Sequence, residues 1–149
     1  MNLVAELPSG LSGLEQLHKM IAMGGRAPIG ETLDFSLIEA DEGRAVFVGT
    51  PSLRAYNPIG SVHGGYAATL LDSACGCATH SRLSPIQGYT TLELKVAFHK
   101  AITTATGPLR AEGRISSFGR RVAFAEATLT DADGKLYASA TSTLLVFER

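Results

Sequence analysis

The strongest hydrophobic pattern in the chain is a run of small and apolar residues from Gly65 to about Thr79. Such residues occur on every side of this run, which is typical of a helix that is buried all round. Residues 90–99 show a second regular pattern, because apolar side chains alternate along them with polar or small ones. That period of two predicts a β-strand with one buried face. The expected buried positions are Leu92, Leu94, Val96 and Phe98.

The remaining patterns predict one short amphipathic helix and five further strands. Residues 11–23 carry Leu14, Leu17 and Ile21 on one stripe and end at two glycines, as a short helix does. The turn sequence at residues 41–43 is expected to join the first two strands as a hairpin. The five expected strands are 28–40, 44–50, 104–117, 121–130 and 136–147.

Strands before and after one long buried helix indicate an α+β fold, in which an antiparallel sheet of about six strands wraps round the helix. We expect a single domain over residues 1–149, with residues 1–27 as an N-terminal helical extension. One helix covers only one face of such a sheet and leaves its edge strands open. We therefore expect identical chains to associate, into a dimer at least.

Composition narrows the functional classes. A net charge of −1 and a pI near 6.4 argue against a general nucleic-acid-binding protein. The N-terminal residues lack the basic flank and apolar core of a signal peptide, and no run is long enough to span a membrane. We therefore expect a cytoplasmic protein with no membrane partner. Cys75 and Cys77 point to different faces of the helix, and no cluster has metal-ligand spacing, so we expect no disulfide, metal or redox cofactor.

Asp72 is the only charged residue in the apolar helix, and no Lys or Arg lies within one helical turn of it. Burying an unpaired carboxylate is costly. Gly65 lies seven residues earlier, on the same face and about 10 Å along the axis. The free N–H groups of the first turn could then stabilise an oxyanion on a substrate that Asp72 also reaches. A structural Asp bonded to backbone or hydroxyl groups is the alternative, and the helix alone leaves both open.

The sequence ahead of the helix completes a motif. Residues 57–65 read Asn-x-x-Gly-x-x-His-Gly-Gly, and with Asp72 they resemble the hotdog-fold acyl-CoA thioesterases, within them the phenylacetate-pathway (PaaI-type) group. The resemblance covers residues 28–147. It implies a hotdog fold and hydrolysis of an aryl-acyl or medium-chain acyl-CoA to the carboxylic acid and coenzyme A. It implies no cofactor, because coenzyme A enters as part of the substrate.

The resemblance also implies roles for the motif residues. Asp72 would be the catalytic carboxylate, as nucleophile or as general base, and the sequence leaves those two roles open. The backbone N–H of Gly65 would polarise the thioester oxygen at the start of the helix. His63 and Asn57 would help to orient that carbonyl or the attacking water. Thr91, from the strand of a partner subunit, would hold water near the acid.

Further expectations concern the partner subunit and the substrate. Thr90 would take the role of Thr91 beside the acid if the strand register differs by one residue. The resemblance implies active sites at a dimer interface and a tetramer built as a dimer of dimers, with the packing mode left open. Coenzyme A carries several negative charges, so basic side chains should line its site. The expected substrate-binding residues are Gly64, Tyr66, Arg120 and Arg121, with Lys100 and Arg54 as further basic candidates.

Two other functions are compatible with the same fold. A hotdog enoyl-CoA hydratase or dehydratase would share the thioester substrate, but such enzymes pair a His and an acid at a different spacing. A non-catalytic acyl-CoA-binding protein would lack the helix carboxylate or carry an additional DNA-binding segment. The sequence leaves the acyl group and the pathway undetermined.

Overall fold

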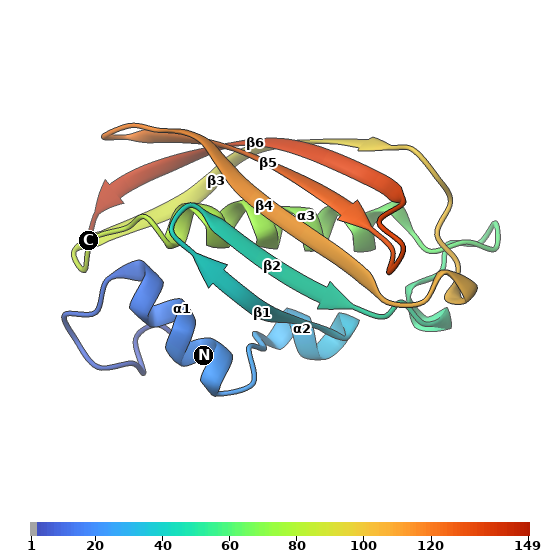
Figure 1. Cartoon of the computed structure of the whole chain (residues 1–149), viewed down its shortest axis with the longest axis horizontal. Coiled ribbons are helices and arrows are strands. Elements are labelled where there is room, and N and C mark those ends of the chain that lie inside the picture. The colour runs from blue at the N-terminus through green and yellow to red at the C-terminus, as the bar shows by residue number, and fades with distance from the viewer. Residues whose placement is uncertain (1–2) are drawn as a thin grey trace.

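The computed structural model describes residues 3–149 and contains an antiparallel six-stranded sheet curled round one long helix, α3 (Figure 1). The strand order is β1-β2-β4-β5-β6-β3, which confirms the predicted α+β hotdog fold. The strands are β1 (Phe35–Asp41), β2 (Arg44–Gly49), β3 (Gln87–Phe98), β4 (Leu109–Phe118), β5 (Val122–Thr130) and β6 (Leu136–Glu148). The α-helices within the described residues are α1 (Gly13–Ala22), α2 (Pro28–Leu33) and α3 (Gly64–His80).

The predicted strand at residues 28–40 is wrong over its first half, which forms α2. Pro28 lies in the first turn of this helix, where its missing N–H costs nothing and its fixed φ suits the helix. Asp34 ends the helix in the left-handed conformation, at φ 56°. The chain then enters β1 at Phe35. The weak alternation of residues 28–33 suggested a strand, but a proline in the first turn favours a helix, and the segment forms one.

The predicted face pattern of β3 is also wrong at two positions: Phe98, at the end of the strand, is 59% exposed, and a β-bulge interrupts the alternation at Leu92. Thr91 pairs with Leu144 of β6, whereas the next paired residue, Glu93, faces Thr143. Leu92 is the extra residue, and its side chain is 57% exposed instead of buried. An extra residue inverts the alternation, so the residues before it and the residues after it follow opposite face patterns. Thr91 therefore points to the inner face of the sheet, toward α3, and not to the outer, polar face.

Helix α3 fills the concave side of the sheet. Leu70, Leu71 and Ala74 are fully buried against it. A Cβ added at Gly113 of β4 would lie 2.3 Å from the carbonyl oxygen of Ala74, so the helix and the sheet are in direct backbone contact there. The helix is not buried all round as predicted, because one stripe stays partly open. The residues of this stripe are Gly65, Ala68, Thr69, Asp72, Ser73 and Cys77.

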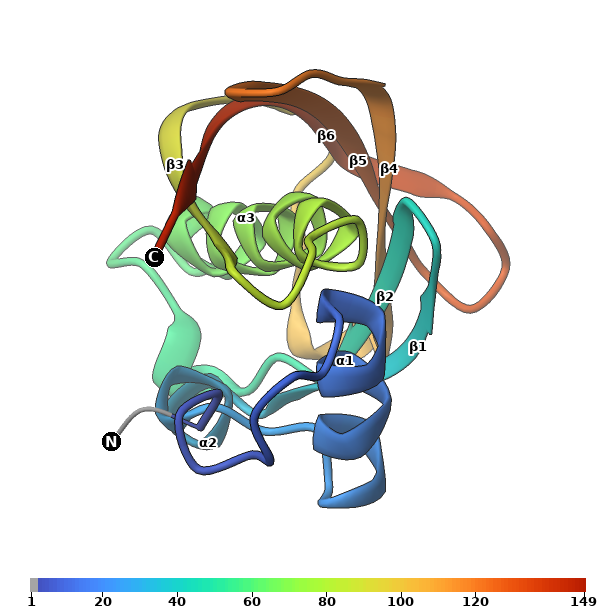
Figure 2. The ribbon, with the colours of Figure 1, turned by 90° about the vertical axis from the view of Figure 1, so that its left-hand side faces the viewer.

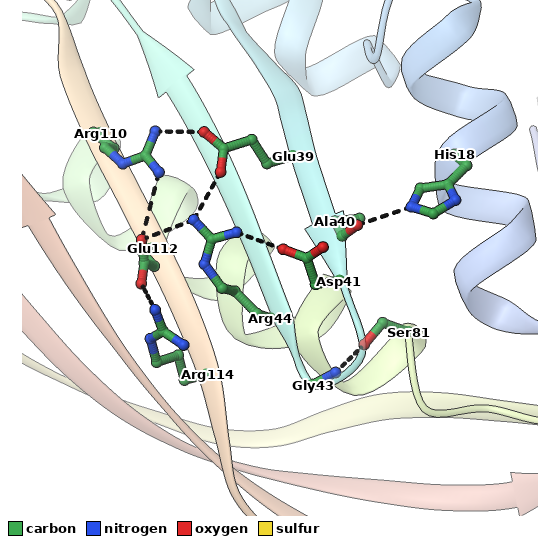
Figure 3. Close-up of polar contacts among 10 residues, drawn as sticks. All are labelled: His18, Glu39, Ala40, Asp41, Gly43, Arg44, Ser81, Arg110, Glu112 and Arg114. Carbon is green, nitrogen blue, oxygen red and sulfur yellow. Dashed lines mark hydrogen bonds and ion pairs between the residues drawn. The ribbon is translucent and has the colours of Figure 1, made fainter.

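The N-terminal helices lie on the side of α3 that the sheet leaves open (Figure 2). Helix α1 begins with a capping box between Ser12 and Glu15. Its first residue, Gly13, donates its N–H to the carbonyl oxygen of Leu83, just beyond α3, at 2.9 Å. The Nε2 atom of His18 donates to the Ala40 carbonyl oxygen of β1 at 2.8 Å (Figure 3). Helix α1 is therefore attached both to the end of α3 and to the first strand.

A network of ion pairs crosses the outer face of β1, β2 and β4 (Figure 3). Glu39 accepts hydrogen bonds from Arg110 at 2.9 Å and from Arg44 at 2.7 Å. Arg44 also reaches Asp41 and Glu112. The hydrogen bonds from Arg110 and Arg44 lower the pKa of Glu39 to about 2. The network therefore links the first hairpin to β4 while Glu39 is ionised.

We expect Glu39→Gln to lower the free energy of unfolding at pH 7 by up to about 1 kcal/mol, because the Glu39 side chain is 41% exposed and solvent screens the pairs. The folded pKa lies below the unfolded value of about 4.3, so this stabilisation is complete above that pH and is lost as the pH falls toward 2. Urea unfolding of parent and variant at several pH values measures it.

Glu126→Gln is the matched control, because Glu126 lies on the outer face of β5 and has no ion pair among residues 3–149. A difference between parent and Glu39→Gln that is the same at pH 7 and near pH 2 would contradict the assignment.

Candidate functional site

The Asp72 carboxylate on α3 is held by Thr91. The Thr91 hydroxyl donates to Asp72 Oδ1 at 3.0 Å, within the same chain. This corrects the expectation that Thr91 approaches the acid from a partner subunit. The bulge at Leu92 is the physical reason, since it turns Thr91 inward onto its own helix. Thr90, the alternative position, is exposed on the other face.

The neighbours of Asp72 are uncharged hydrogen-bond donors. Burial raises the pKa of Cys77 to about 12, and the charge of Asp72 adds to this shift. Burial also raises the pKa of Tyr89 well above its ordinary value, with Cys77 and Asp72 contributing. Both groups therefore keep their protons at neutral pH. Among the described residues, no Lys or Arg forms an ion pair with Asp72, so its charge is available to a substrate or a water molecule.

Asp72 and Thr91 line a cavity of about 470 Å³. Its walls are mostly apolar and come from several elements, among them Phe35 and Leu37 of β1 and Phe47 of β2. The helix contributes Gly76, and a Cβ there would lie 2.7 Å from the Tyr89 hydroxyl oxygen, so the glycine lets the phenol approach α3 closely. A carboxylate at the wall of an apolar cavity of this size can act on the polar end of a largely apolar substrate.

The beginning of α3 has a different arrangement from the expected one. His63 is the N-cap, and its Nδ1 atom accepts a hydrogen bond from the Gly65 N–H at 2.8 Å. The Gly65 N–H, expected to bind the thioester oxygen, is therefore occupied by the histidine. Because Nδ1 accepts, the ring proton lies on Nε2, which becomes the free donor. The N–H of Gly64 has no hydrogen-bond partner among residues 3–149.

His63 and Gly64 line a second cavity, of about 400 Å³, together with Ala67, Phe98 and Lys100. A Cβ at Gly64 would lie 3.0 Å from the Phe98 ring, so a glycine is needed for that contact. Asp72 does not line this cavity, and neither His63 nor Gly64 lines the cavity beside Asp72. One chain thus keeps the acid and the donors at the helix start in two separate cavities, where the sequence suggested one.

Asn57 and Tyr66 have structural surroundings. The side-chain oxygen of Asn57 accepts the N–H groups of Ile59 and Ser61, both at 3.1 Å, and its amide nitrogen donates to the Ser61 hydroxyl at 3.0 Å. Asn57 therefore shapes the loop that delivers His63. Tyr66 is buried in the core and lines neither cavity, which corrects its assignment as a substrate contact.

The basic candidates are divided between the two ends of α3. Arg120 and Arg121 lie in the β4–β5 turn, at the C-terminal end of the helix (Figure 1). Lys100 lines the cavity at the N-terminal end, and the adjacent Lys135, which the sequence analysis missed, lowers the pKa of Lys100. Arg54 is exposed on a short helical turn before His63. Lys100, which shares the cavity with His63, is therefore the basic candidate placed to bind phosphate.

Within residues 3–149, no group of three or more His, Cys, Asp and Glu side chains could hold a metal ion. Over the same residues, none of the helices has both the length and the apolar character needed to cross a membrane.

Comparisons with known proteins agree with this geometry. A family model described as "Thioesterase superfamily" matches residues 59–138, which include the start of α3, Asp72 and Thr91. The candidate esterase SSO2140 of Saccharolobus solfataricus is 34% identical over 109 residues, covering 72% of this chain and 75% of that protein.

Two solved structures show the same fold. A thioesterase family protein from Silicibacter pomeroyi superposes with a TM-score of 0.79 at 25% identity, over 89% of this chain and 99% of that one. The PaaI protein of the E. coli phenylacetic acid degradation operon has a TM-score of 0.78 at 20% identity, over 91% of this chain and 94% of that one. The latter likeness concerns the fold alone.

Proposed function

Because the chain belongs to the thioesterase superfamily, we propose that it hydrolyses acyl-CoA thioesters to a carboxylic acid and coenzyme A. The observation that carries the proposal is the Asp72 carboxylate, which has no cation paired with it in the described chain, is held by Thr91 and lines an apolar cavity. An apolar cavity of this kind can hold an acyl chain. The carboxylate at its wall can act as the base or nucleophile that hydrolyses the thioester bond at the end of that chain.

In the general-base form of the reaction, Asp72 takes a proton from water while the water oxygen attacks the thioester carbon. The carbonyl π electrons move onto oxygen, and N–H donors at the start of α3 stabilise that oxyanion. When the carbonyl re-forms, the C–S bond breaks and the sulfur leaves as a thiolate, which takes the proton from Asp72. If Asp72 is instead the nucleophile, its oxygen forms an anhydride as the thiolate leaves, and water then cleaves the anhydride.

The donors in this scheme belong to the helix start. Since Gly65 donates to His63 Nδ1, the Nε2–H of His63 and the N–H of Gly64 are the groups free to bind the oxyanion. The Gly65 N–H contributes indirectly. Its hydrogen bond to Nδ1 keeps the His63 proton on Nε2, and this tautomer can donate to the oxyanion. Lys100, which lines the same cavity, and its neighbour Lys135 would bind the phosphates of coenzyme A.

We further propose that each active site combines the His63 end of one subunit with the Asp72–Thr91 pair of another. Two observations support this. The acid and the donors line separate cavities within one chain. Within residues 3–149, the edge strand β3 pairs with β6 alone. It exposes Leu92 and Phe98, at 57% and 59%, which suits association with a second copy. The tetramer remains a prediction.

We expect Asp72→Asn to reduce turnover by about 10²- to 10⁴-fold, because the amide keeps the shape but removes the base or nucleophile. The measurement is thiol release from a panel of aryl- and medium-chain acyl-CoA substrates, with circular dichroism to show that the variant folds. Near-parental turnover would overturn the catalytic assignment. Tight binding of acyl-CoA by the parent without any hydrolysis would instead favour a non-catalytic acyl-CoA-binding protein.

We expect Thr91→Ala to slow turnover by roughly tenfold, since it removes one hydrogen bond to a charged group. Thr91→Ser, which keeps the hydroxyl, should retain most of the activity and is the matched comparison. Steady-state kinetics on the same substrate distinguishes the two variants. Equal loss in both would show that the methyl group matters and not the hydrogen bond.

Mixed oligomers test the shared active site. Asp72→Asn and His63→Ala each inactivate every site of a homodimer, but a heterodimer keeps one site with both parts intact. Random assortment of two subunits then restores about one quarter of parental activity. Co-expression with two affinity tags isolates the heterodimer for assay. Absence of any recovery in a folded heterodimer would place both parts of the site in one chain.

A further inference from the structure

Helix α1 forms part of the wall of the cavity that contains Asp72. Leu17 and Met20, one turn apart on α1, line this cavity together with Asp72 and Thr91. Figure 2 shows α1 across the side of α3 that the sheet leaves open. Residues 13–22 lie outside the segment 59–138 that matches the family model. The wall opposite the catalytic helix is thus supplied by this chain's own N-terminal extension.

The contacts that dock α1 place it at the far end of the cavity. His80, which also lines the cavity, pairs through Nε2 with the Gln16 side-chain oxygen at 2.8 Å. The Gln16 amide in turn donates to the Leu11 carbonyl at 2.9 Å. Burial lowers the pKa of His80 to about 4, and the charge of Arg149 acts in the same direction. His80 is therefore neutral at physiological pH, so its imidazole presents no charge to the end of an apolar chain, and the cation at this end of the cavity is Arg149.

The length of the cavity follows from positions on α3. Asp72 and His80 both line it and are eight residues apart, or about 12 Å along the helix axis. An extended chain advances roughly 1.2 Å per bond. A straight acyl chain that starts with its carbonyl near Asp72 and runs beside α3 therefore reaches the end after roughly ten carbons.

Met20 separates this cavity from a second one. It lines both the cavity beside Asp72 and a small cavity of about 50 Å³, whose other walls are Leu3, Leu7, Met23 and Arg26. Met20 is only partly buried and its side chain is unbranched, so shortening it opens a path between the two cavities without removing a central core residue.

We propose that helix α1 sets the acyl-chain length that this protein accepts, that Met20 is the residue that limits it, and that the preferred substrates are medium-chain acyl-CoAs. The inference rests on the proposed thioesterase function and specifies its substrate class. Leu17 is fully buried and holds α1 against the core, whereas Met20 closes the route to the outer cavity.

The test compares kcat/KM for straight-chain acyl-CoAs from four to sixteen carbons. In the parent we expect a rise of about fourfold per added methylene, as burial of each methylene predicts, ending near roughly ten carbons. Met20→Ala should move this optimum to longer chains by two or more carbons, with little change for the shortest substrates. Met20→Phe should move the optimum to shorter chains. This second variant still tests the proposal if Met20→Ala loosens the packing of α1.

Met23→Ala is the matched control. Met23 is 69% exposed and lines only the outer cavity, so its removal should leave the optimum unchanged while Met20 is present. Identical length profiles for the parent and both Met20 variants would overturn the proposal. So would a parent profile without any optimum, or an optimum that moves equally with Met23→Ala.

The test also separates this inference from the thioesterase proposal. Binding of non-hydrolysable thioether analogues of the same acyl-CoA series is measured by calorimetry for each variant. If the parent cleaves no acyl-CoA, the thioesterase proposal fails, but a shift of the binding optimum with Met20→Ala would still support α1 as the length-limiting element. If hydrolysis occurs and neither optimum moves, the inference about Met20 alone fails.

Discussion

A single helix has to fill the concave side of a six-stranded sheet, and this requirement governs most of the molecule. Small residues dominate α3 because it lies in backbone contact with the strands, as the 2.3 Å between a Cβ at Gly113 and the Ala74 carbonyl oxygen shows. A carboxylate has no place on the packed sides of such a helix. Asp72 therefore lies on the one stripe that the sheet leaves open, where its charge can meet a substrate.

The fold was predictable from the sequence because long patterns determine it. The apolar run of α3 and the turns between strands defined the α+β arrangement. The segment 28–33 was assigned to the wrong element, and so was the start of the predicted strand 104–117, where Thr104–Thr106 form a short 3-10 helix. The failure at Thr91 has a different origin. A bulge adds one residue to one strand of a pair, and its cause lies in how β3 fits β6 and α3, not in the alternation along β3 itself. Because of this one extra residue, Thr91 contacts Asp72 of its own chain, whereas the sequence suggested a contact with a partner subunit.

The candidate site was predictable by residue type but not by arrangement. The motif His63, Gly64, Gly65 and Asp72 identified the residues, and helical periodicity placed Gly65 and Asp72 on one face. Periodicity contains no information about which groups already have partners. The structure shows the Gly65 N–H bonded to His63 Nδ1, so the donor function passes to other atoms of the same motif. Lys135 was missed because it is distant in sequence and meets Lys100 only through the β5–β6 turn.

The N-terminal extension supplies a wall of the Asp72 cavity that lies outside the segment matched by the family model. The sheet and α3 must keep their shape, since each supports the other, so little of the cavity wall can change without loss of the core. Helix α1 is held by hydrogen bonds through Gly13, Gln16 and His18 and by the buried side chain of Leu17, whereas Met20 lines the cavity and is only partly buried. A partly buried side chain on such a wall can vary in size at a smaller cost to stability than a fully buried one. Met20 lies between two cavities, so a change in its size alters the depth of the cavity beside Asp72, which is the basis of its proposed role in acyl-chain length.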